Sequence, residues 1–232
     1  MPVATTLPLR DSPGFRAGIS IAVAVGLYGI SFGALAIAAG LTTLQAMALS
    51  ALMFTGGSQF AFIGVLSGGG SPGAALGAAS LLGVRNGVYG IQMNALIRPP
   101  KRLKPVAAHV TIDESAATAL GQEGPTERRR GFWTAGLGVF ILWNLFTLVG
   151  ALVGETMGDP NAWGLDGAAV AAFLGLLWPH LKKREPAGIA VAGALVTALC
   201  VPWTPAGVPI LVAALVATTI TLWTGRGIRS DR

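Results

Sequence analysis

The chain of 232 residues has few charged side chains: Asp, Glu, Lys and Arg together make up 11% of it, against about 25% in a typical soluble domain. Hydrophobic residues make up 53%, and the mean hydropathy is +0.65. This shortage of charge argues against a soluble enzyme and favours an integral membrane protein. The length fits a single transmembrane domain that covers residues 1–232.

Cysteine and histidine are almost missing. Cys200 is the one cysteine, so no disulfide can form within the chain, and His109 and His180 are the two histidines. The sequence has no H-E-x-x-H, C-x-x-C or P-loop pattern, so metal and nucleotide chemistry have no visible basis. A match to the G-x-S-x-G hydrolase pattern at residues 29–33 lies inside an apolar run and lacks its histidine–acid pair. We expect no enzyme activity, no catalytic residues, no metal and no cofactor.

Seven apolar runs approach the length of about 20 residues that a helix needs to cross the hydrocarbon core. They predict an all-α integral membrane protein with about seven transmembrane helices. These are expected near residues 17–39, 44–67, 72–97, 132–154, 162–181, 186–201 and 207–223. The first run is too long for the apolar part of a secretory leader, which has roughly 7–15 residues.

The basic residues gather in the connections between apolar runs. The net charge of +6 therefore points to a membrane surface and not to nucleic acid. Lysines and arginines cluster in residues 98–130, in residues 182–185 and at the C-terminus, whereas the other connections contain none. The positive-inside rule places these three basic segments in the cytoplasm, with residues 98–130 as a loop. We expect a multi-pass protein of the cell membrane, the inner membrane in a bacterium.

The side of the N-terminus is ambiguous. Counting back through three crossings places it outside, whereas Arg10 and Arg16 favour the cytoplasm. Either the N-terminus is external, or the first two apolar runs are not both simple crossings. With an external N-terminus, spans one to three would run opposite to spans four to six. That arrangement, a 3+3 inverted repeat plus one helix, is common among secondary transporters.

Arg85 stands in the middle of the third apolar run, from Pro72 to Ile97, which has no other charged residue. An arginine at the centre of a spanning helix costs about 3 kcal/mol on insertion scales, so it normally faces a protein interior or a wet cavity. Asn86 follows Arg85, and Tyr89 comes one helical turn later. Arg85 is therefore a candidate binding residue. The alternative is that it pairs with a buried carboxylate to hold helices together.

The second apolar run is interrupted by Gly56 and Gly57, which Ser58 and Gln59 follow. A glycine inside a helix costs about 1 kcal/mol relative to alanine, and non-helical backbone at membrane depth must line protein or water. We therefore expect a discontinuous second helix. A half-helix that begins at this break would present free N–H groups and its positive end to an anion. The alternative is close helix packing through small residues.

The polar segment 98–130 contains the neighbouring acids Asp113 and Glu114. Thr111 and Glu114 have the spacing of a capping box, which indicates the start of a cytoplasmic helix. A second interpretation places Asp113 or Glu114 at the inner mouth of a transport pathway, as coupling or gating residues that exchange a proton.

Taken together, these motifs resemble the AzlC family of branched-chain amino-acid permeases, the large subunits of two-component exporters. The resemblance covers nearly the whole chain. It rests on Phe32–Gly33, Gly56–Phe60, Arg85–Asn86 with Tyr89, Asp113–Glu114, Trp143, Gly164–Asp166 leading into Phe173, and Pro209–Ala214. Many members have an asparagine two residues before the arginine and a histidine after it, where this chain has Gly83 and Asn86.

The resemblance implies export of branched-chain or other hydrophobic amino acids, together with a separately encoded small AzlD-like membrane subunit. We expect an ion or proton gradient to drive export. Arg85 or the N–H groups at Gly57–Gln59 are the expected contacts of the substrate carboxylate. Asn86, Tyr89 and the Gln59 side chain would complete the polar shell. The alternative function is a non-transporting scaffold or assembly subunit for a partner membrane protein.

Overall fold

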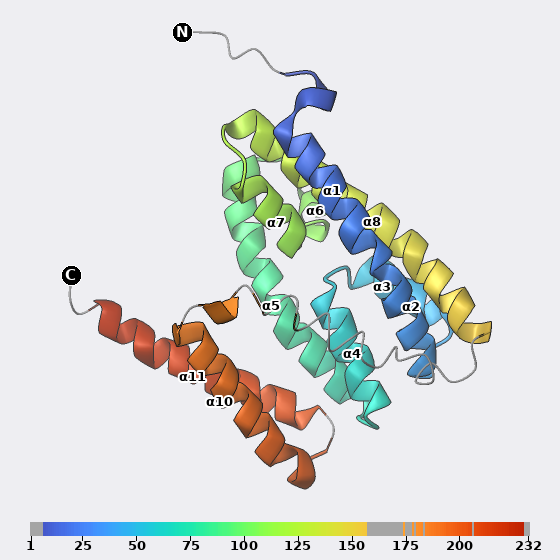
Figure 1. Ribbon diagram of the computed structural model, residues 1–232, viewed down its shortest axis with the longest axis vertical. Helices are drawn as coiled ribbons and strands as arrows, with labels where there is room; N and C mark the ends of the chain where they lie inside the picture. The colour runs from blue at the N-terminus through green and yellow to red at the C-terminus, as the bar shows by residue number, and fades with distance from the viewer. Residues whose placement is uncertain are drawn as a thin grey trace.

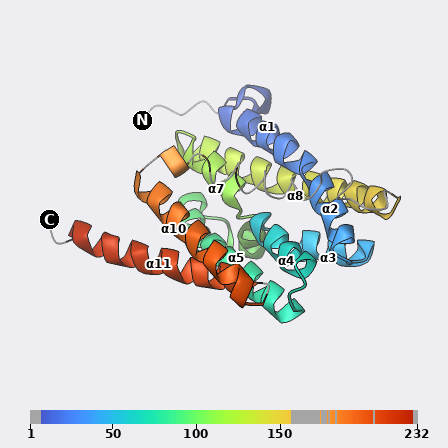
Figure 2. The same cartoon turned by 60° about the horizontal axis from the view of Figure 1, so that its bottom comes forward.

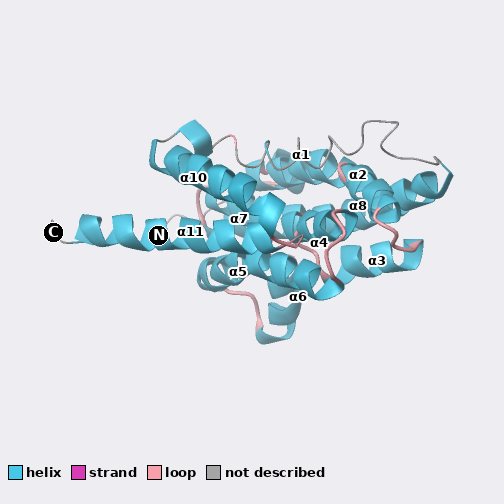
Figure 3. Ribbon diagram, turned by 90° about the horizontal axis from the view of Figure 1, so that it is seen from below, coloured by secondary structure: helices cyan, strands magenta, loops and turns pink. Residues whose placement is uncertain are grey.

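The computed structural model describes residues 7–156, 174, 178, 180–182, 184–205 and 207–229. Within these residues the regular structure is entirely helical (Figures 1 and 3), which confirms the predicted all-α fold. Three helical stretches are long and apolar enough to cross a membrane: Pro13–Ala38, Pro125–Thr156 and Arg184–Trp203. The expected count of seven crossings is not shown. The fifth expected span, with residues 164–166, lies almost entirely outside the described residues.

Two long, parallel helical stretches pack along each other over much of the length of the molecule. Helices α1 (Pro13–Leu27) and α2 (Gly29–Ala38) follow one another with a slight break at Tyr28, and both lie along α8 (Pro125–Thr156) (Figure 1). The side chain of Ser12 caps α1 by accepting a hydrogen bond from the Phe15 N–H. Proline at the first position of α1 fits the helix start, because its missing N–H would be unpaired there anyway.

Two glycines set the close approach of α2 to α8. A Cβ atom on Gly33 would lie 2.1 Å from the carbonyl oxygen of Thr147, and one on Gly150 would lie 2.0 Å from that of Ile30. No side chain fits at such distances, so the helices can pack this closely only with glycine at both positions. The four-residue spacing of glycines in both helices therefore serves helix packing.

Helix α5 (Pro72–Ile97) runs in the opposite direction. Ile97, at its end, packs with Phe132 near the start of α8, and the Nε of Arg129 donates a hydrogen bond to the Ile97 carbonyl at 2.9 Å. With 26 residues α5 has the length to cross a bilayer. It is less apolar than the three stretches above.

The first hairpin, residues Thr43–Ser67, replaces the predicted second crossing. Its helix α3 (Thr43–Leu52) begins beside the end of α8, where the Thr43 hydroxyl donates to Glu155. It then runs towards the middle of α8, where the Ser50 hydroxyl donates to the Thr147 hydroxyl at 3.2 Å. Helix α4 (Gly57–Ser67) returns along α5 to the end from which α3 came. The predicted break is confirmed, but the chain reverses there instead of crossing.

The second hairpin, residues Lys104–Leu120, lies within the segment 98–130 and enters the protein from the other end; the cytoplasmic side of this segment stays a prediction. The hairpin follows the short helix η2 (Lys101–Leu103) and consists of α6 (Lys104–His109) and α7 (Asp113–Leu120). Val110 packs against Gly136, midway along α8. The segment can enter the protein because it is rich in alanine and has no lysine or arginine after Lys104.

The helix start in the second hairpin also differs from the prediction. Helix α7 has Ile112 as its N-cap, and the Ser115 hydroxyl accepts a hydrogen bond from the Ile112 N–H at 3.0 Å. The Thr111 hydroxyl instead donates to the Ala107 carbonyl at 2.6 Å. The predicted capping box of Thr111 with Glu114 is therefore wrong, because Ser115 occupies the position from which a side chain reaches the cap.

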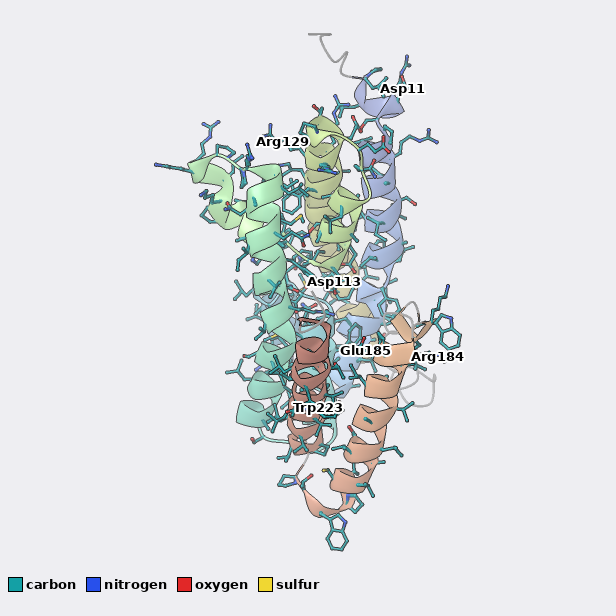
Figure 4. The ribbon with its side chains drawn as sticks, turned by 90° about the vertical axis from the view of Figure 1, so that its left-hand side faces the viewer. Asp11, Asp113, Arg129, Arg184, Glu185 and Trp223 are labelled. Atoms are coloured by element: carbon teal, nitrogen blue, oxygen red, sulfur yellow. The ribbon has the colours of Figure 1, made fainter. Side chains whose placement is uncertain are left out.

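The tips of the two hairpins meet in the middle of the molecule. Phe54 in the first tip lies 6.0 Å from His109 in the second, measured between ring centroids. Both rings contact Phe140 of α8, at 5.1 and 5.4 Å respectively. Asp113 at the second tip consequently lies well away from Asp11 and Arg129, which mark one end of the molecule (Figure 4).

That end, which we call the basic end, contains the N-terminal segment. Helix η1 (Leu9–Asp11) precedes α1, the Nη1 of Arg130 donates to the Leu7 carbonyl at 2.8 Å, and the Ser12 hydroxyl donates to Glu127. Arg10 and Arg16 thus lie at the same end as the connection after α5. Of the two alternatives for the N-terminus, the structure supports the second: the first two apolar runs are not both simple crossings.

The predicted 3+3 repeat stays a prediction, since one of its spans lies outside the described residues. What the described residues do show is a helix followed by a re-entrant hairpin, twice. The unit from Pro13 to Ser67 runs in one direction, and the unit from Pro72 to Leu120 runs in the opposite direction.

The C-terminal helices form an antiparallel pair, and Ile210 packs against Val65 and Ala75 of the rest of the molecule. Helix α10 (Arg184–Cys200) and helix α11 (Val208–Arg229) lie side by side (Figure 2) and are joined through η5 (Val201–Trp203). The Thr224 hydroxyl donates to Glu185 Oε1 at 3.0 Å across the pair. The short helix η4 (His180–Lys182) precedes α10. This pair confirms helices at the sixth and seventh expected spans.

Candidate functional site

Arg85 lies at mid-length of α5 and points its guanidinium to the meeting point of the hairpins. Leu82, Arg85, Asn86 and Tyr89 have the spacing of one helix face. The Nη2 atom of Arg85 forms an ion pair with Oδ2 of Asp113 at 2.7 Å. The two side chains are 37% and 25% exposed in the described structure. The pair is therefore shielded, yet still open to a ligand.

Asp113 is the first residue of α7, so its carboxylate stands at the positive end of that helix dipole. The Tyr89 side chain lies near it, and Glu114 is close enough to interact with both Asp113 and Arg85. One of the two interpretations of the sequence placed Asp113 or Glu114 at the inner mouth of a transport pathway. The structure instead places Asp113 at the centre, as the partner of Arg85.

The start of α4 faces the same guanidinium. A Cβ atom on Gly57 would lie 2.9 Å from Arg85 Nη2. Gly56 is the N-cap, with φ +61° and ψ −82°, a conformation that favours glycine. Because glycine has no side chain, no side-chain hydrogen bond caps the helix. Gly56 and Gly57 thus let the uncapped, positive end of α4 come close to the positive side chain of Arg85. Two positive groups this close are stabilised by a negative group between or beside them.

Ser58 and Gln59 follow as buried residues of the first turn of α4, with exposures of 1% and 0%. The Ser58 hydroxyl faces α5 near Gly83, at 3.6 Å from the position of a Cβ there. The Gln59 side chain turns the other way, and its Nε2 donates to the Leu49 carbonyl of α3 at 2.9 Å. Gln59 therefore ties the two arms of the first hairpin together, whereas Ser58 faces the arginine-bearing helix.

An unusual set of polar atoms lies around this centre. Among the described residues, six buried side-chain atoms have no hydrogen-bond partner: Thr55 Oγ1, Ser58 Oγ, Gln59 Oε1, Arg85 Nε, Asn86 Oδ1 and Trp143 Nε1. Buried polar groups in proteins are nearly always satisfied, and leaving one unsatisfied costs about 1–3 kcal/mol. All six belong to the first hairpin, to α5 or to α8. Three of them, Ser58 Oγ, Arg85 Nε and Asn86 Oδ1, belong to residues at the start of α4 and on the Arg85 turn of α5, and these point to a site for a polar ligand.

The predicted site residues thus fall into two groups. Gly56, Gly57, Ser58, Arg85 and Asp113 converge where the hairpin tips meet α5. The remaining predicted residues surround them: Asn86, Tyr89, Gln59 and Glu114. The prediction missed two residues with unpartnered atoms, Thr55 and Trp143. Thr55 could have been found as the polar residue directly before the glycine break, and Trp143 from its place in the family resemblance.

Aromatic rings form a wall behind α4. Trp143 stacks on Phe32, with ring centroids 6.0 Å apart, and Phe60 meets both rings edge-on at 5.7 and 6.2 Å. These residues belong to the largest apolar cluster around the hairpin tips. The centre therefore combines a few fixed polar groups with a rigid apolar side, as small-molecule sites commonly do. Among the described residues, no three His, Cys, Asp or Glu side chains come together as a metal site.

The fold and this centre define a class: an all-helical membrane protein with two hairpins that meet at a charged pair between long helices. Comparison with known sequences then gives the family. The profile of the AzlC protein family matches residues 20–157, and the chain belongs to this family, whose members are generally related to branched-chain amino-acid permeases. The match includes α2 to α8 and every predicted site residue.

A relative in Archaeoglobus fulgidus (strain ATCC 49558 / DSM 4304 / JCM 9628 / NBRC 100126 / VC-16) is described as an uncharacterized membrane protein. It is 29% identical over 225 residues, which cover 94% of this chain and 98% of the relative. No solved structure matches the chain. The family and the relative agree with a membrane protein over nearly the full length.

Proposed function

We propose that this protein is a membrane transporter that exports branched-chain or other hydrophobic amino acids. The observation that carries the proposal is the Arg85 guanidinium at mid-length of α5, 2.7 Å from Asp113 and beside Gly57 at the start of α4. Guanidinium binds carboxylates bidentately. A polar centre of this kind inside apolar helices, beside a broken helix, is typical of secondary transporters.

The sidedness follows from the distribution of charge. The basic end gathers Arg10, Arg16, residues 98–104 and residues 128–130, so the positive-inside rule places it in the cytoplasm. The first hairpin then enters from outside and the second from the cytoplasm. With the two hairpins reaching Arg85 from opposite sides, each is suited to close one access route. The cytoplasmic C-terminus remains part of this proposal.

Two further parts come from the family. A small AzlD-like membrane subunit is the proposed partner, and the exposed apolar side chains of α10 and α11, such as Leu199 and Trp223, leave area for lipid or a helical partner. An ion or proton gradient is the proposed energy source. Glu114, which lies beside the charged pair, is the proposed coupling residue.

A scaffold or assembly role is the second candidate function, and the Arg85–Asp113 ion pair itself favours it. An arginine whose charge is balanced by a carboxylate on another element holds two elements together without any ligand. The two functions predict different results when the pair is altered.

The test is efflux of labelled leucine from vesicles that contain the protein and its partner subunit. Replacement of Arg85 by glutamine removes the bidentate contact and is expected to lower the efflux rate by about tenfold or more. Arg102→Gln, the same change at an exposed position of the basic end, is the matched control and is expected to transport normally. Protein level and association with the partner are measured in the same preparations.

Transport by the unmutated protein at the rate of empty vesicles would sink the transporter proposal. Normal efflux by Arg85→Gln would show that the carboxylate is bound elsewhere. Loss of folded protein or of partner association, with no specific effect on efflux, would favour the scaffold.

A further inference from the structure

The unpartnered atoms of the site differ in their hydrogen-bonding chemistry. Arg85 Nε can only donate, whereas Asn86 Oδ1 can only accept. The hydroxyls of Thr55 and Ser58 can do either. A simple anion would satisfy the donor and leave the acceptor unsatisfied, and a simple cation would do the reverse. The site therefore calls for a ligand that carries both kinds of group.

The charges are arranged with the same polarity. The guanidinium of Arg85 and the uncapped start of α4 at Gly57 lie together on one side. The carboxylates of Asp113 and Glu114 lie on the other side, at the start of α7. The field between the two hairpin tips thus runs from positive at the first hairpin to negative at the second.

From this geometry we infer that the site recognises a zwitterion: Arg85 and the start of α4 bind the α-carboxylate, and Asp113 binds the α-ammonium group. The inference rests on the proposed transport of amino acids and adds the residue that reads the amine. An α-amino acid carries both charges on one carbon atom. It can therefore enter between Arg85 and Asp113 and replace their direct contact with two new ion pairs.

Charge balance explains why both groups are needed. A carboxylic acid without the amine would form an ion pair with Arg85. The Asp113 carboxylate would then have no cation to pair with. An amine without the carboxylate would take Asp113 and leave Arg85 unpaired beside the positive start of α4. Breaking a shielded ion pair in this way is costly, because one charge remains uncompensated. A zwitterion leaves the net charge of the site unchanged.

The experiment compares the binding of three ligands that share the isobutyl side chain of leucine. It uses the protein reconstituted with its partner subunit. The ligands are leucine, 4-methylpentanoate, which lacks the amine, and 3-methylbutylamine, which lacks the carboxylate. Binding of each labelled compound is measured at equilibrium. For the unmutated protein, leucine is expected to bind about tenfold more tightly, or more, than either analogue.

Variants then separate the two charges. Asp113→Asn is expected to weaken leucine binding by about tenfold or more while leaving 4-methylpentanoate no weaker, so that the preference for leucine over this acid falls to near one. Arg85→Gln should remove the preference for leucine over 3-methylbutylamine instead. Glu155→Gln, the same chemical change at the far end of α8, is the control and should keep both preferences.

Each result decides a different statement. If the unmutated protein binds no leucine, both the proposed function and this inference are wrong. If it binds leucine and 4-methylpentanoate equally, or if Asp113→Asn keeps the preference for leucine, the inference alone is wrong. Should Asp113→Asn fail to fold, the double variant Arg85→Gln with Asp113→Asn removes both charges together, and it is expected to bind all three compounds with similar weakness. The ligand series on the unmutated protein tests the inference without any variant.

Discussion

The two hairpins follow a similar path but differ in the charge that they carry. Each enters the molecule from one end, reverses at mid-length of α8 and returns. The first, Thr43–Ser67, contains no charged residue, whereas the second, Lys104–Leu120, brings Asp113 and Glu114 to its tip. The positive charge beside the first tip comes from Arg85 of α5. Charge is therefore placed on one hairpin alone, and its counter-charge on a helix that both hairpins touch.

The tips also differ in how their polar groups are satisfied. In the second tip the Thr111 hydroxyl donates to Ala107, and the Ser115 hydroxyl donates to the Val110 carbonyl at 2.8 Å. In the first tip the hydroxyls of Thr55 and Ser58 have no partner within the described structure. The second tip is thus held by its own hydrogen bonds, and the first keeps free hydrogen-bonding groups beside Arg85. This difference leaves the Thr55 and Ser58 hydroxyls of the first tip available to a ligand.

The largest expected effect concerns the path of the first hairpin, and it is all-or-none. A hairpin puts residues 41 and 68 on the same side of the membrane, whereas a single crossing would put them on opposite sides. We expect Leu41→Cys and Gly68→Cys, each in a Cys200→Ser background, to react with a membrane-impermeant maleimide added from the same side. Labelling in intact cells and in inverted vesicles measures this.

The control for this experiment is Lys101→Cys, at the basic end, which should react from the opposite side. Reaction of positions 41 and 68 from different sides would overturn the hairpin and restore the simple crossing that the sequence predicted.

A smaller effect distinguishes the two tips. Ser115→Ala removes hydrogen bonds to Ile112 and Val110 and is expected to lower the free energy of unfolding by about 1 kcal/mol. Ser58→Ala removes a hydroxyl without a partner, so we expect a change within about 0.5 kcal/mol in the absence of ligand. Thermal unfolding of the purified protein in detergent measures both. Equal losses would mean that the first tip is satisfied in the same way as the second.

Two features that are energetically unfavourable in a membrane helix predicted the central residues of the candidate site. Arg85 in an apolar run and two glycines in another run each require a special environment in a membrane, and the structure brings both together. The path of the chain was harder to predict. An apolar run such as residues 44–67 has the same composition whether it crosses the membrane or turns back at Gly56. Hydropathy indicates that a segment lies in the membrane, but it does not indicate where the chain reverses.

The second hairpin was missed for a different reason. The basic residues at both ends of segment 98–130 gave it the charge of a cytoplasmic loop. Its middle part carries the acids that Arg85 needs, but the pairing of Arg85 with Asp113 joins residues that are 28 positions apart. Such a contact depends on tertiary packing, which no local pattern records. The conflict over Arg10 and Arg16 was the one sign in the sequence that the first two apolar runs are not both simple crossings.

The central claim is that a transported amino acid binds at Arg85 between the two hairpin tips. Gly83→Cys in a Cys200→Ser background tests it directly, because a side chain at position 83 fits in ordinary contact with Ser58 and lies two residues from Arg85. The rate at which N-ethylmaleimide modifies this cysteine is measured with and without saturating leucine. Leucine is expected to slow the modification several-fold, because binding at the site shields the thiol. An unchanged rate, in a variant that still exports leucine, would contradict it.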